Sequence, residues 1–344
     1  YTNNPPAGAY RGFGAPQAHF AAETQMDILA EKLLIPPLEL RRKNALRVGS
    51  VTVTGQVLRD SVGLVETIDR VSEALREEGP AEAPGPSKRR GWGVACAYKN
   101  VGLGGGAPDS AGAEVELFED GHAEVRAGAS EVGQGLVAVL AQIVAEELGV
   151  PYERVQVLVG DTDLTPDGGP TTASRQTYIS GNAARLAARR VRQALALLAG
   201  DELNAAPEAL VFDHGTIQAP GGSSIPLQEV IRLARAKGVS VTAREVYTPP
   251  ATAPLGQEGD MHFAFGYATQ AAEVEVDITS GAVSILRVIA AHDVGTTVNP
   301  LALQGQLEGG VAMGIGYALM EDFAVKQGVP QKTCLLYTSD AADE

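Results

Sequence analysis

The stretch "AGAEVELFEDGHAEVRAGA" (111–129) contains two runs of alternating residues around an Asp-Gly pair at 120–121. The residues that alternate with their neighbours are Ala113, Val115, Leu117, Ala123 and Val125. A period of two on either side of Asp-Gly predicts a β-hairpin. The hairpin is followed by "GQGLVAVLAQIVAEELGV" (133–150), which has the spacing of a helix, and by "PYERVQVLVGDT" (151–162), which predicts a further strand.

The same patterns continue in both directions along the chain. Towards the N-terminus we expect three helices, within 18–35, 36–46 and 61–79, and a strand over 91–100. Towards the C-terminus we expect helices and hairpins in alternation: a long amphipathic helix over 173–200, a hairpin over 209–219, a helix over 226–238, a long hairpin over 270–295 that turns at Ser280-Gly281, and a helix over 299–323. This order predicts an α+β fold with antiparallel hairpins and not a doubly wound parallel sheet.

Composition limits the class of protein. The chain has 344 residues, of which 44% are hydrophobic, so it is long enough for one large or two ordinary domains. The segment "PAEAPGPSKRR" (80–90) has the composition of a linker and divides the chain into 1–79 and 91–333. A net charge of −15 argues against nucleic acid or an anionic membrane as a general partner. No apolar run is long enough for a membrane span, so a cytoplasmic protein is expected.

Both ends of the sequence are unusual. The segment "CLLYTSDAADE" (334–344) differs in composition from the rest and resembles a translated sequencing adaptor, so it is left out of the fold prediction. The first residue is not methionine, and the sequence opens within a loop, so we expect a truncation at both ends. Cys96 is then the only remaining cysteine and is expected to be a small buried residue, which excludes an iron–sulfur cluster or a structural zinc site within this chain. The five histidines have no metal-ligand spacing.

Four glycine-rich segments stand out: "YRGFGAPQ" (10–17), "SEVGQGL" (130–136), "GDTDLTPDGGPTTAS" (160–174) and "NPLALQGQLEGG" (299–310). The first three come directly before predicted helices. Because a helix start presents unpaired N–H groups, such loops can bind an anionic ligand through local donors even in an acidic protein. Taken singly, each could equally be an ordinary helix cap or turn. The segment 99–109, "KNVGLGGGAPD", either lines the same pocket or is a plain glycine loop between two strands.

In combination, these segments resemble the large, molybdenum-cofactor-binding subunit of the xanthine dehydrogenase and aldehyde oxidase family. The resemblance covers 1–333 and includes the runs "YTNNPPAGAYRGFGAPQ" (1–17), "AYKNVGLGGGAPDSAGAEVEL" (97–117) and "ASEVGQGL" (129–136). It implies the two-domain molybdopterin-binding fold of that family, with mixed and antiparallel sheets and packed helices. Residues 1–79 would then be the C-terminal part of the first domain, and 91–333 a second domain that is incomplete at its C-terminus.

The resemblance also implies roles for individual residues. Those that would bind the cofactor are Arg11, Gly12, Gly133, Gln134, Gly135, Thr172, Ala173, Ser174 and Gln306. Of these, Arg11 and the backbone of Ala173 would lie beside the molybdenum, and Phe13 would pack against a flat substrate. No catalytic residue is identified, because the family's general-base glutamate belongs to a "GxGE"-type motif that does not occur before residue 334. Glu131 and Glu308 belong to the cofactor motifs instead.

The function implied is oxidative hydroxylation of an aromatic N-heterocycle, such as a purine (xanthine) or a nicotinate-like ring, with water as the oxygen source. The cofactor would be molybdopterin or its cytosine dinucleotide form. Electrons would pass to [2Fe-2S] and FAD groups on separate partner subunits, in an assembly of the dimer-of-heterotrimers kind. This fragment alone is expected to be inactive.

Two alternatives stay open: an aldehyde oxidoreductase of the same family, or a non-catalytic module for cofactor binding or assembly. Carbon monoxide oxidation is less favoured, because those relatives read more like "AYRGAGRPE" and lack the aromatic ring that Phe13 supplies.

Overall fold

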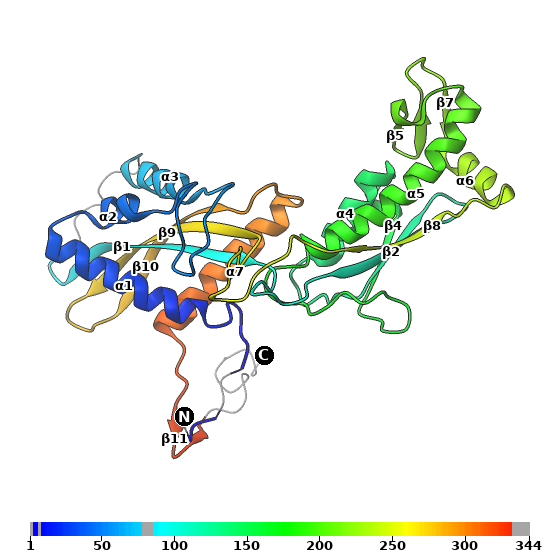
Figure 1. The fold of residues 1–344 in the computed structure, drawn as a ribbon. Coiled ribbons are helices and arrows are strands. Elements are labelled where there is room, and N and C mark those ends of the chain that lie inside the picture. The colour runs from blue at the N-terminus through cyan, green and yellow to red at the C-terminus, as the bar shows by residue number, and fades with distance from the viewer. Residues whose placement is uncertain (1–2, 6–7, 78–84, 332–344) are drawn as a thin grey trace.

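The computed structural model describes residues 3–5, 8–77 and 85–331. The protein has two lobes that lie side by side and meet near the middle of the molecule (Figure 1). The chain starts in the first lobe, crosses to the second within 102–110 and returns within 248–263. The expected tail (334–344) and the first part (80–84) of the expected linker (80–90) lie outside the described residues.

The first lobe is built on a three-stranded antiparallel sheet with β9 in the middle. Its strands are β1 (Lys88–Val101), β9 (Ala264–Asp277) and β10 (Val283–Asp293). The helices are α1 (Ala15–Leu33), α2 (Pro37–Asn44), α3 (Leu64–Glu77) and α7 (Pro300–Leu319). In α3 the buried side chains Leu64, Ile68 and Val71 follow helical spacing, and Ile68 packs with Tyr267 of β9 in the core of this lobe.

Cys96 lies in β1 of this lobe and is partly buried. Burial raises the pKa of its thiol, an effect that a contact with Thr269 Oγ1 (3.4 Å) offsets only in part. A raised pKa keeps the thiol protonated and unreactive, which agrees with the structural role predicted from the sequence.

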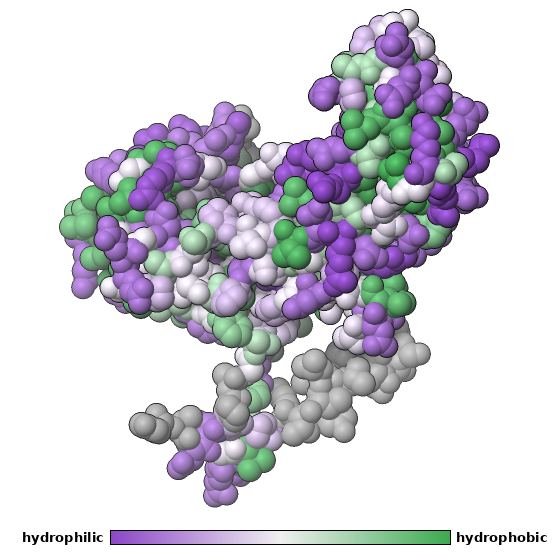
Figure 2. All heavy atoms as spheres, turned by 45° about the vertical axis from the view of Figure 1, so that its right-hand side comes forward, coloured by the Kyte–Doolittle hydropathy of each residue, from purple (hydrophilic) through white to green (hydrophobic). Residues whose placement is uncertain are grey.

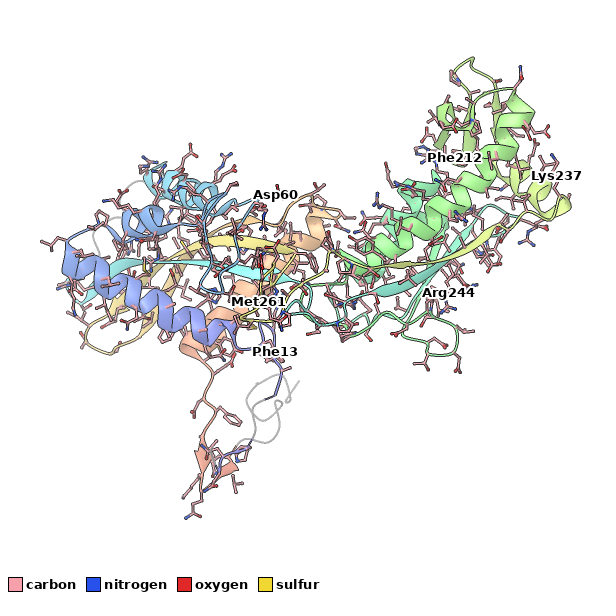
Figure 3. All side chains as sticks on the ribbon, in the orientation of Figure 1. Phe13, Asp60, Phe212, Lys237, Arg244 and Met261 are labelled. Carbon is pink, nitrogen blue, oxygen red and sulfur yellow. The ribbon has the colours of Figure 1, made fainter. Side chains whose placement is uncertain are left out.

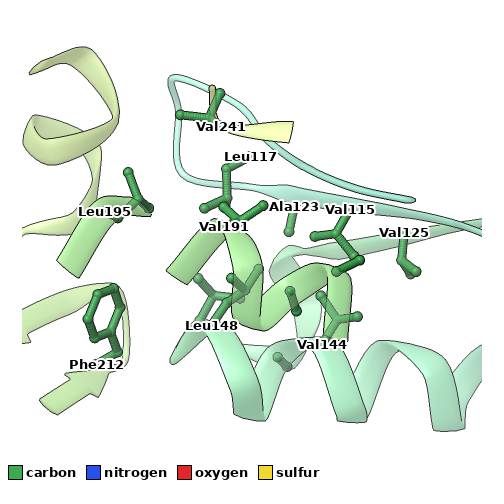
Figure 4. Packing of buried hydrophobic residues seen from close by; sticks show 14 of the residues in the cluster. Val115, Leu117, Ala123, Val125, Val144, Leu148, Val191, Leu195, Phe212 and Val241 are labelled. Carbon is green, nitrogen blue, oxygen red and sulfur yellow. The ribbon is translucent and has the colours of Figure 1, made fainter. Parts of the chain in front are cut away.

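The second lobe is built on the four-stranded sheet β4-β3-β2-β8, in which β3 and β4 are parallel and the other neighbours antiparallel. Its strands are β2 (Ala111–Leu117), β3 (Ala123–Ala127), β4 (Val155–Val159) and β8 (Thr242–Tyr247), and two helices, α4 (Leu136–Leu148) and α5 (Ile179–Leu203), pack against it. Figure 4 shows Val115 and Leu117 of β2 packed with Val144 of α4 and Val191 of α5. The parallel pair needs a crossover, which α4 provides.

A small extension lies at the far end of the second lobe (Figure 1). It contains a three-stranded antiparallel sheet, β5 (Val211–Asp213), β6 (Thr216–Gln218) and β7 (Ser224–Pro226), together with α6 (Leu227–Ala236) and the short turns η1 (Tyr152–Arg154) and η2 (Pro207–Ala209). A last hairpin, β11 (Val325–Lys326) and β12 (Val329–Pro330), follows α7. Hydrophilic side chains cover most of the face seen in Figure 2. None of the described helices is long and apolar enough to cross a membrane.

The α+β class with mixed and antiparallel sheets is confirmed, as is the hairpin that turns at Asp120-Gly121. Several details differ from the sequence-based expectation, and the short strands β7, β11 and β12 are among the elements that were not expected. The helix expected from residue 173 begins at Ile179, and β8 was not expected at all. Strand β1 begins at Lys88, within the expected linker, and α3 on one side of that linker packs against β9 on the other. The division into two domains at 80–90 stays a prediction.

Candidate functional site

The "RGFG" loop has a backbone that few sequences can adopt. Gly12, Phe13 and Gly14 all have positive φ, at 90°, 49° and 88°, so three successive residues lie in the left-handed region. Gly14 then caps α1. A Cβ at Gly12 would lie 2.7 Å from Cδ of Pro16, so glycine is also required there for space. The ring of Phe13 is 76% exposed and lies near the point where the two lobes meet (Figure 3).

Arg11 connects this loop to the glycine-rich helix α7. Its Nη2 donates to the side-chain oxygen of Gln306 at 2.8 Å and to the backbone oxygen of the same residue at 3.1 Å. A Cβ at Gly309, almost one turn further along α7, would lie 3.2 Å from Nη1 of Arg11. Two residues that are 295 positions apart in the sequence, and that were both predicted as cofactor contacts, are therefore in direct contact.

The "SEVGQG" loop is closed by one of its own side chains. The carboxylate of Glu131 accepts hydrogen bonds from the N–H groups of Gly133 (2.8 Å), Gly135 (3.0 Å) and Val137 (3.0 Å) at the start of α4. Burial raises the pKa of Glu131, but these N–H donors outweigh it and leave the pKa below its ordinary value. From the sequence, Glu131 was assigned only as a member of this motif. In the structure its carboxylate occupies the start of α4, where an anionic ligand was expected.

Gln134 also engages its own loop. Its side-chain oxygen accepts from the N–H of Val132 at 2.6 Å, and its amide nitrogen donates to the carbonyl of Ser130 at 2.9 Å. Gly135 faces the first turn of α7, since a Cβ at this position would lie 3.6 Å from Cβ of Ala302. The loop before α4 therefore lies near the start of α7, separated by a space that a methyl group on Gly135 would just fill.

The "PTTAS" turn contains a second left-handed pair. Ala173 and Ser174 have φ of 52° and 53°, a conformation that costs non-glycine residues about 1–3 kcal/mol each. The turn ends five residues before α5 and does not form its cap, which corrects the expectation that it directly opens a helix. The carbonyl of Ala173 accepts from the N–H of Gly102 at 2.9 Å, and Oγ1 of Thr171 accepts from the N–H of Ser130 at 2.9 Å.

The 99–109 segment contains Lys99 and packs against His262, and the motifs singled out neither residue. Burial lowers the pKa of Lys99, whose ammonium group donates to the side-chain oxygen of Asn100 at 2.7 Å. The pKa of His262 is lowered by burial and by the charge of Lys99, and its Nδ1 is buried without a hydrogen-bond partner. A Cβ at Gly104 would lie 2.0 Å from this Nδ1, so the imidazole packs directly on the glycine loop. His262 follows no glycine motif, so no sequence signal marked it.

These contacts form one connected set at the junction of the lobes. The set runs from Arg11 to α7, from α7 to the loop at Gly135, and from Ser130 to the "PTTAS" turn and Gly102. Within the described part of the chain, no hydrogen bond or ion pair joins Arg11 to Ala173 directly. Hydrogen bonds therefore join the "RGFG" loop to α7 and the "SEVGQG" loop to the "PTTAS" turn, and the two pairs lie near each other where Gly135 faces Ala302.

The side chains and backbone around these turns are mostly uncharged: glycine backbones, the amides of two glutamines and one exposed aromatic ring, with one arginine. The carboxylate of Glu131 already accepts from the N–H groups of Gly133 and Gly135, so among the charged groups Arg11 is the one suited to an anionic ligand. The described residues contain no group of three or more His, Cys, Asp or Glu side chains that could hold a metal ion. The site therefore fits a cofactor that brings its own metal ligands better than a metal held directly by protein side chains.

Comparison with known proteins identifies two matching regions. Residues 67–337 and residues 1–45 match two families that are both described as "Molybdopterin cofactor-binding domain". The chain is 35% identical to a putative xanthine dehydrogenase molybdenum-binding subunit of Escherichia coli (strain K12), over 98% of this chain and 45% of the relative. It is 32% identical to an aldehyde oxidoreductase of Megalodesulfovibrio gigas, over 94% of this chain and 33% of the relative.

Among solved structures, quinoline 2-oxidoreductase from Pseudomonas putida 86 superimposes with a TM-score of 0.84 at 30% sequence identity. The match covers 96% of this chain and 44% of that protein. The chain thus spans less than half the length of these relatives.

Proposed function

Because the chain belongs to the family of molybdopterin cofactor-binding domains, we propose that it forms part of the catalytic subunit of a molybdenum hydroxylase. One observation carries this proposal: Arg11 of the "RGFG" loop is hydrogen-bonded to Gln306 of the "GQLEGG" helix. These residues are 295 positions apart, and both were expected at the cofactor on motif grounds alone. If these glycine turns were only helix caps, that role would not require the side chains of Arg11 and Gln306 to meet.

Each residue would hold the cofactor in its own way. Arg11 would place a fixed positive charge against the anionic group, and Gln306 keeps that guanidinium in one orientation. The backbones of Gly12, Gly133 and Gly135 allow close approach. When bound, the molybdenum-pterin group supplies the two-electron redox chemistry and the oxygen transfer from water.

The remaining proposed contacts come from two turns. The "PTTAS" turn would present the backbone of Thr172, Ala173 and Ser174, with Ala173 nearest the metal. Gln134 would contact the cofactor after exchanging its present bonds to Val132 and Ser130 for bonds to the ligand. No general base is assigned within this sequence.

For the substrate we propose an aromatic N-heterocycle. The exposed ring of Phe13 offers a flat apolar face to a planar molecule, and two of the relatives are named for xanthine and quinoline. The aldehyde oxidoreductase relative keeps an aldehyde as the second candidate. Electrons would leave through [2Fe-2S] and FAD groups on partner subunits, in a dimer of heterotrimers. The choice between molybdopterin and its cytosine dinucleotide, and a cytoplasmic location, remain part of the same proposal.

The test is metal analysis of the 344-residue chain expressed with a supply of the cofactor. We expect molybdenum and pterin to co-purify with the wild type and with the Arg189→Met control, which removes an ion pair between α5 and Glu147 of α4. Arg11→Met should lower the molybdenum content. A folded wild-type protein without molybdenum, or equal contents in both variants, would refute the proposal.

A second assay separates the enzyme from a non-catalytic module. The chain alone should show no turnover of a heterocycle or an aldehyde with a dye acceptor. Turnover in a full-length subunit with its partners, lost in Arg11→Met, would support the enzyme and reject the assembly module.

A further inference from the structure

Arg175, directly after the "PTTAS" turn, is a fully buried arginine with 0% of its side chain exposed. Its three nitrogens donate to one carboxylate and three carbonyls: Nε to Oδ1 of Asp109 at 2.6 Å, Nη1 to the carbonyls of Gly168 at 2.6 Å and Pro170 at 3.0 Å, and Nη2 to that of Ser110 at 2.8 Å. This guanidinium is used entirely inside the protein and is not available to a ligand.

Asp109 continues the connection on the other side. Only 5% of its side chain is exposed, and its second oxygen, Oδ2, accepts from the N–H of Leu103 at 2.7 Å. The ion pair therefore joins the glycine loop at 102–106 to the turn that contains Ala173 and Ser174. The direct bond from the N–H of Gly102 to the carbonyl of Ala173 lies between the same two segments.

Two glycines lie directly against this ion pair. Gly169 has φ of 63°, and a Cβ there would lie 3.1 Å from Nη2 of Arg175. A Cβ at Gly102, with φ of 80°, would lie 2.6 Å from Oδ2 of Asp109. Both sides of the ion pair are thus packed against backbone that only glycine provides without strain.

Burying an ion pair in this space carries a desolvation cost that apolar side chains would not have. A buried pair is often no more stabilising than well-packed apolar residues of the same volume, although removal of one partner alone leaves a buried charge uncompensated. Apolar side chains would fill the space but would not fix the orientation of the backbone around it. The planar guanidinium holds the carboxylate and three carbonyls in place at once. A turn with two successive left-handed non-glycine residues persists only where its surroundings determine it.

We propose that Arg175 and Asp109 are positioning residues, which hold the Ala173–Ser174 turn against the 102–106 loop so that its backbone is set for the cofactor. The inference rests on the proposed function, since it assigns the turn to the same site. Neither residue contacts the cofactor; they act through Ala173 and Ser174. Nothing in the motif pattern marked Arg175 or Asp109 for this role.

Four variants of the 344-residue chain and one control variant test this. Arg175→Met and Asp109→Asn each break the pair, and the double variant Arg175→Met/Asp109→Leu replaces it with apolar groups and orphans no charge. Arg189→Met is the control, because its ion pair joins α5 to Glu147 of α4, outside the candidate site, and is more exposed. Arg175→Lys keeps the positive charge but lacks the planar guanidinium, so its exchange rate and its rate of molybdenum loss should fall between those of the wild type and Arg175→Met.

The first readout is amide hydrogen exchange in the cofactor-free protein. Exchange at Gly102 should accelerate about tenfold or more in the double variant, the scale expected when a hydrogen bond loses its support. Exchange at Val191 and Leu195, in the buried part of α5, should stay at the wild-type rate and report that the fold is intact.

The second readout is the rate at which molybdenum is lost from the loaded protein during dialysis. That rate should rise about tenfold or more in the double variant and stay unchanged in Arg189→Met. A merely structural pair predicts instead that the double variant, once folded, retains the cofactor like the wild type.

The outcomes are distinct. Exchange at Gly102 and cofactor loss within about twofold of wild type in the folded double variant overturn the inference. If the wild type holds no molybdenum, the proposed function fails, and the exchange of Gly102 still decides whether the pair positions the turn. Should Arg175→Met alone not fold, Asp109→Asn and the double variant carry the test.

Discussion

Replacement of Ala173 by glycine should stabilise the protein, although alanine-to-glycine changes usually destabilise. Ala173 has φ of 52°, in a region that costs a residue with a Cβ about 1–2 kcal/mol. Glycine removes that cost but gains about 0.4–1 kcal/mol of freedom in the unfolded chain. The difference predicts a gain in the free energy of unfolding of about 0.5–1 kcal/mol for Ala173→Gly.

The control is Ala22→Gly, at an exposed position in α1 where the backbone is helical. It should lose about 1 kcal/mol, because glycine is the poorer helix former. Urea unfolding followed by circular dichroism measures both, with the shift read from the midpoint at unchanged slope. The two variants should move in opposite directions. A loss in Ala173→Gly as large as that in Ala22→Gly would refute the strained turn.

The same variant has a consequence for binding. Glycine at 173 leaves the turn free to leave its left-handed conformation, so the backbone expected at the molybdenum is no longer held before the ligand arrives. We therefore expect Ala173→Gly to be more stable than wild type and yet to lose molybdenum faster during dialysis. Stability and retention that rise together would show that the strain has no part in binding.

Three further changes have definite outcomes. Arg11→Met and Gln306→Leu, measured singly and together by urea unfolding, should couple by about 0.5–1.5 kcal/mol, and additive losses would exclude their side-chain bond in solution. Gly104→Ala should cost more than about 2 kcal/mol in the same assay, because its Cβ would lie 2.0 Å from Nδ1 of His262 at φ of 68°; a smaller loss would mean that the imidazole can move away. The pKa of Glu131 is lowered in the folded state, so the ionised carboxylate contributes to the free energy of unfolding above its unfolded pKa of about 4.3, and this contribution is lost as the pH falls through the folded pKa. The urea unfolding midpoints of the wild type and Glu131→Gln should therefore converge towards low pH. Midpoints that stay equally far apart at every pH would contradict this.

The elements that the sequence predicts well are those with a strong period. The hairpin around Asp120-Gly121 and the helix with Leu136, Leu140 and Val144 on one face repeat their pattern over several turns or pleats, so their type is determined locally. Strand β8 was missed because its residues, "TAREVY", alternate weakly and owe their strand state to pairing with β2. Tertiary pairing of this kind leaves little trace in a single sequence.

For the site, the sequence marks the residues that line it but not those that support it. Gly12, Gly14 and Gly135 are visible because a turn with positive φ needs glycine, and glycine can be read directly. Ala173 and Ser174 have positive φ without glycine, so their conformation could not be read in this way. Charged residues are usually solvated, and burial is a property of the fold, so nothing in the sequence separates a buried arginine from an exposed one.

We expect Arg11 and Arg175 to have different roles in the candidate site: Arg11 supplies charge, and Arg175 holds the backbone in position. Arg175 is neutralised by Asp109, so it contributes geometry and no net field. Among the described residues, Arg11 donates to the side-chain and backbone oxygens of Gln306, which are both neutral. A chain of net charge −15 repels an anionic ligand at long range, and a nearby uncompensated charge is what can reverse this at the site. Loss of Arg11 should therefore weaken cofactor binding most at low ionic strength, where its charge is least screened. The effect of the Arg175→Met/Asp109→Leu double variant, which leaves the net charge unchanged, should be nearly independent of salt.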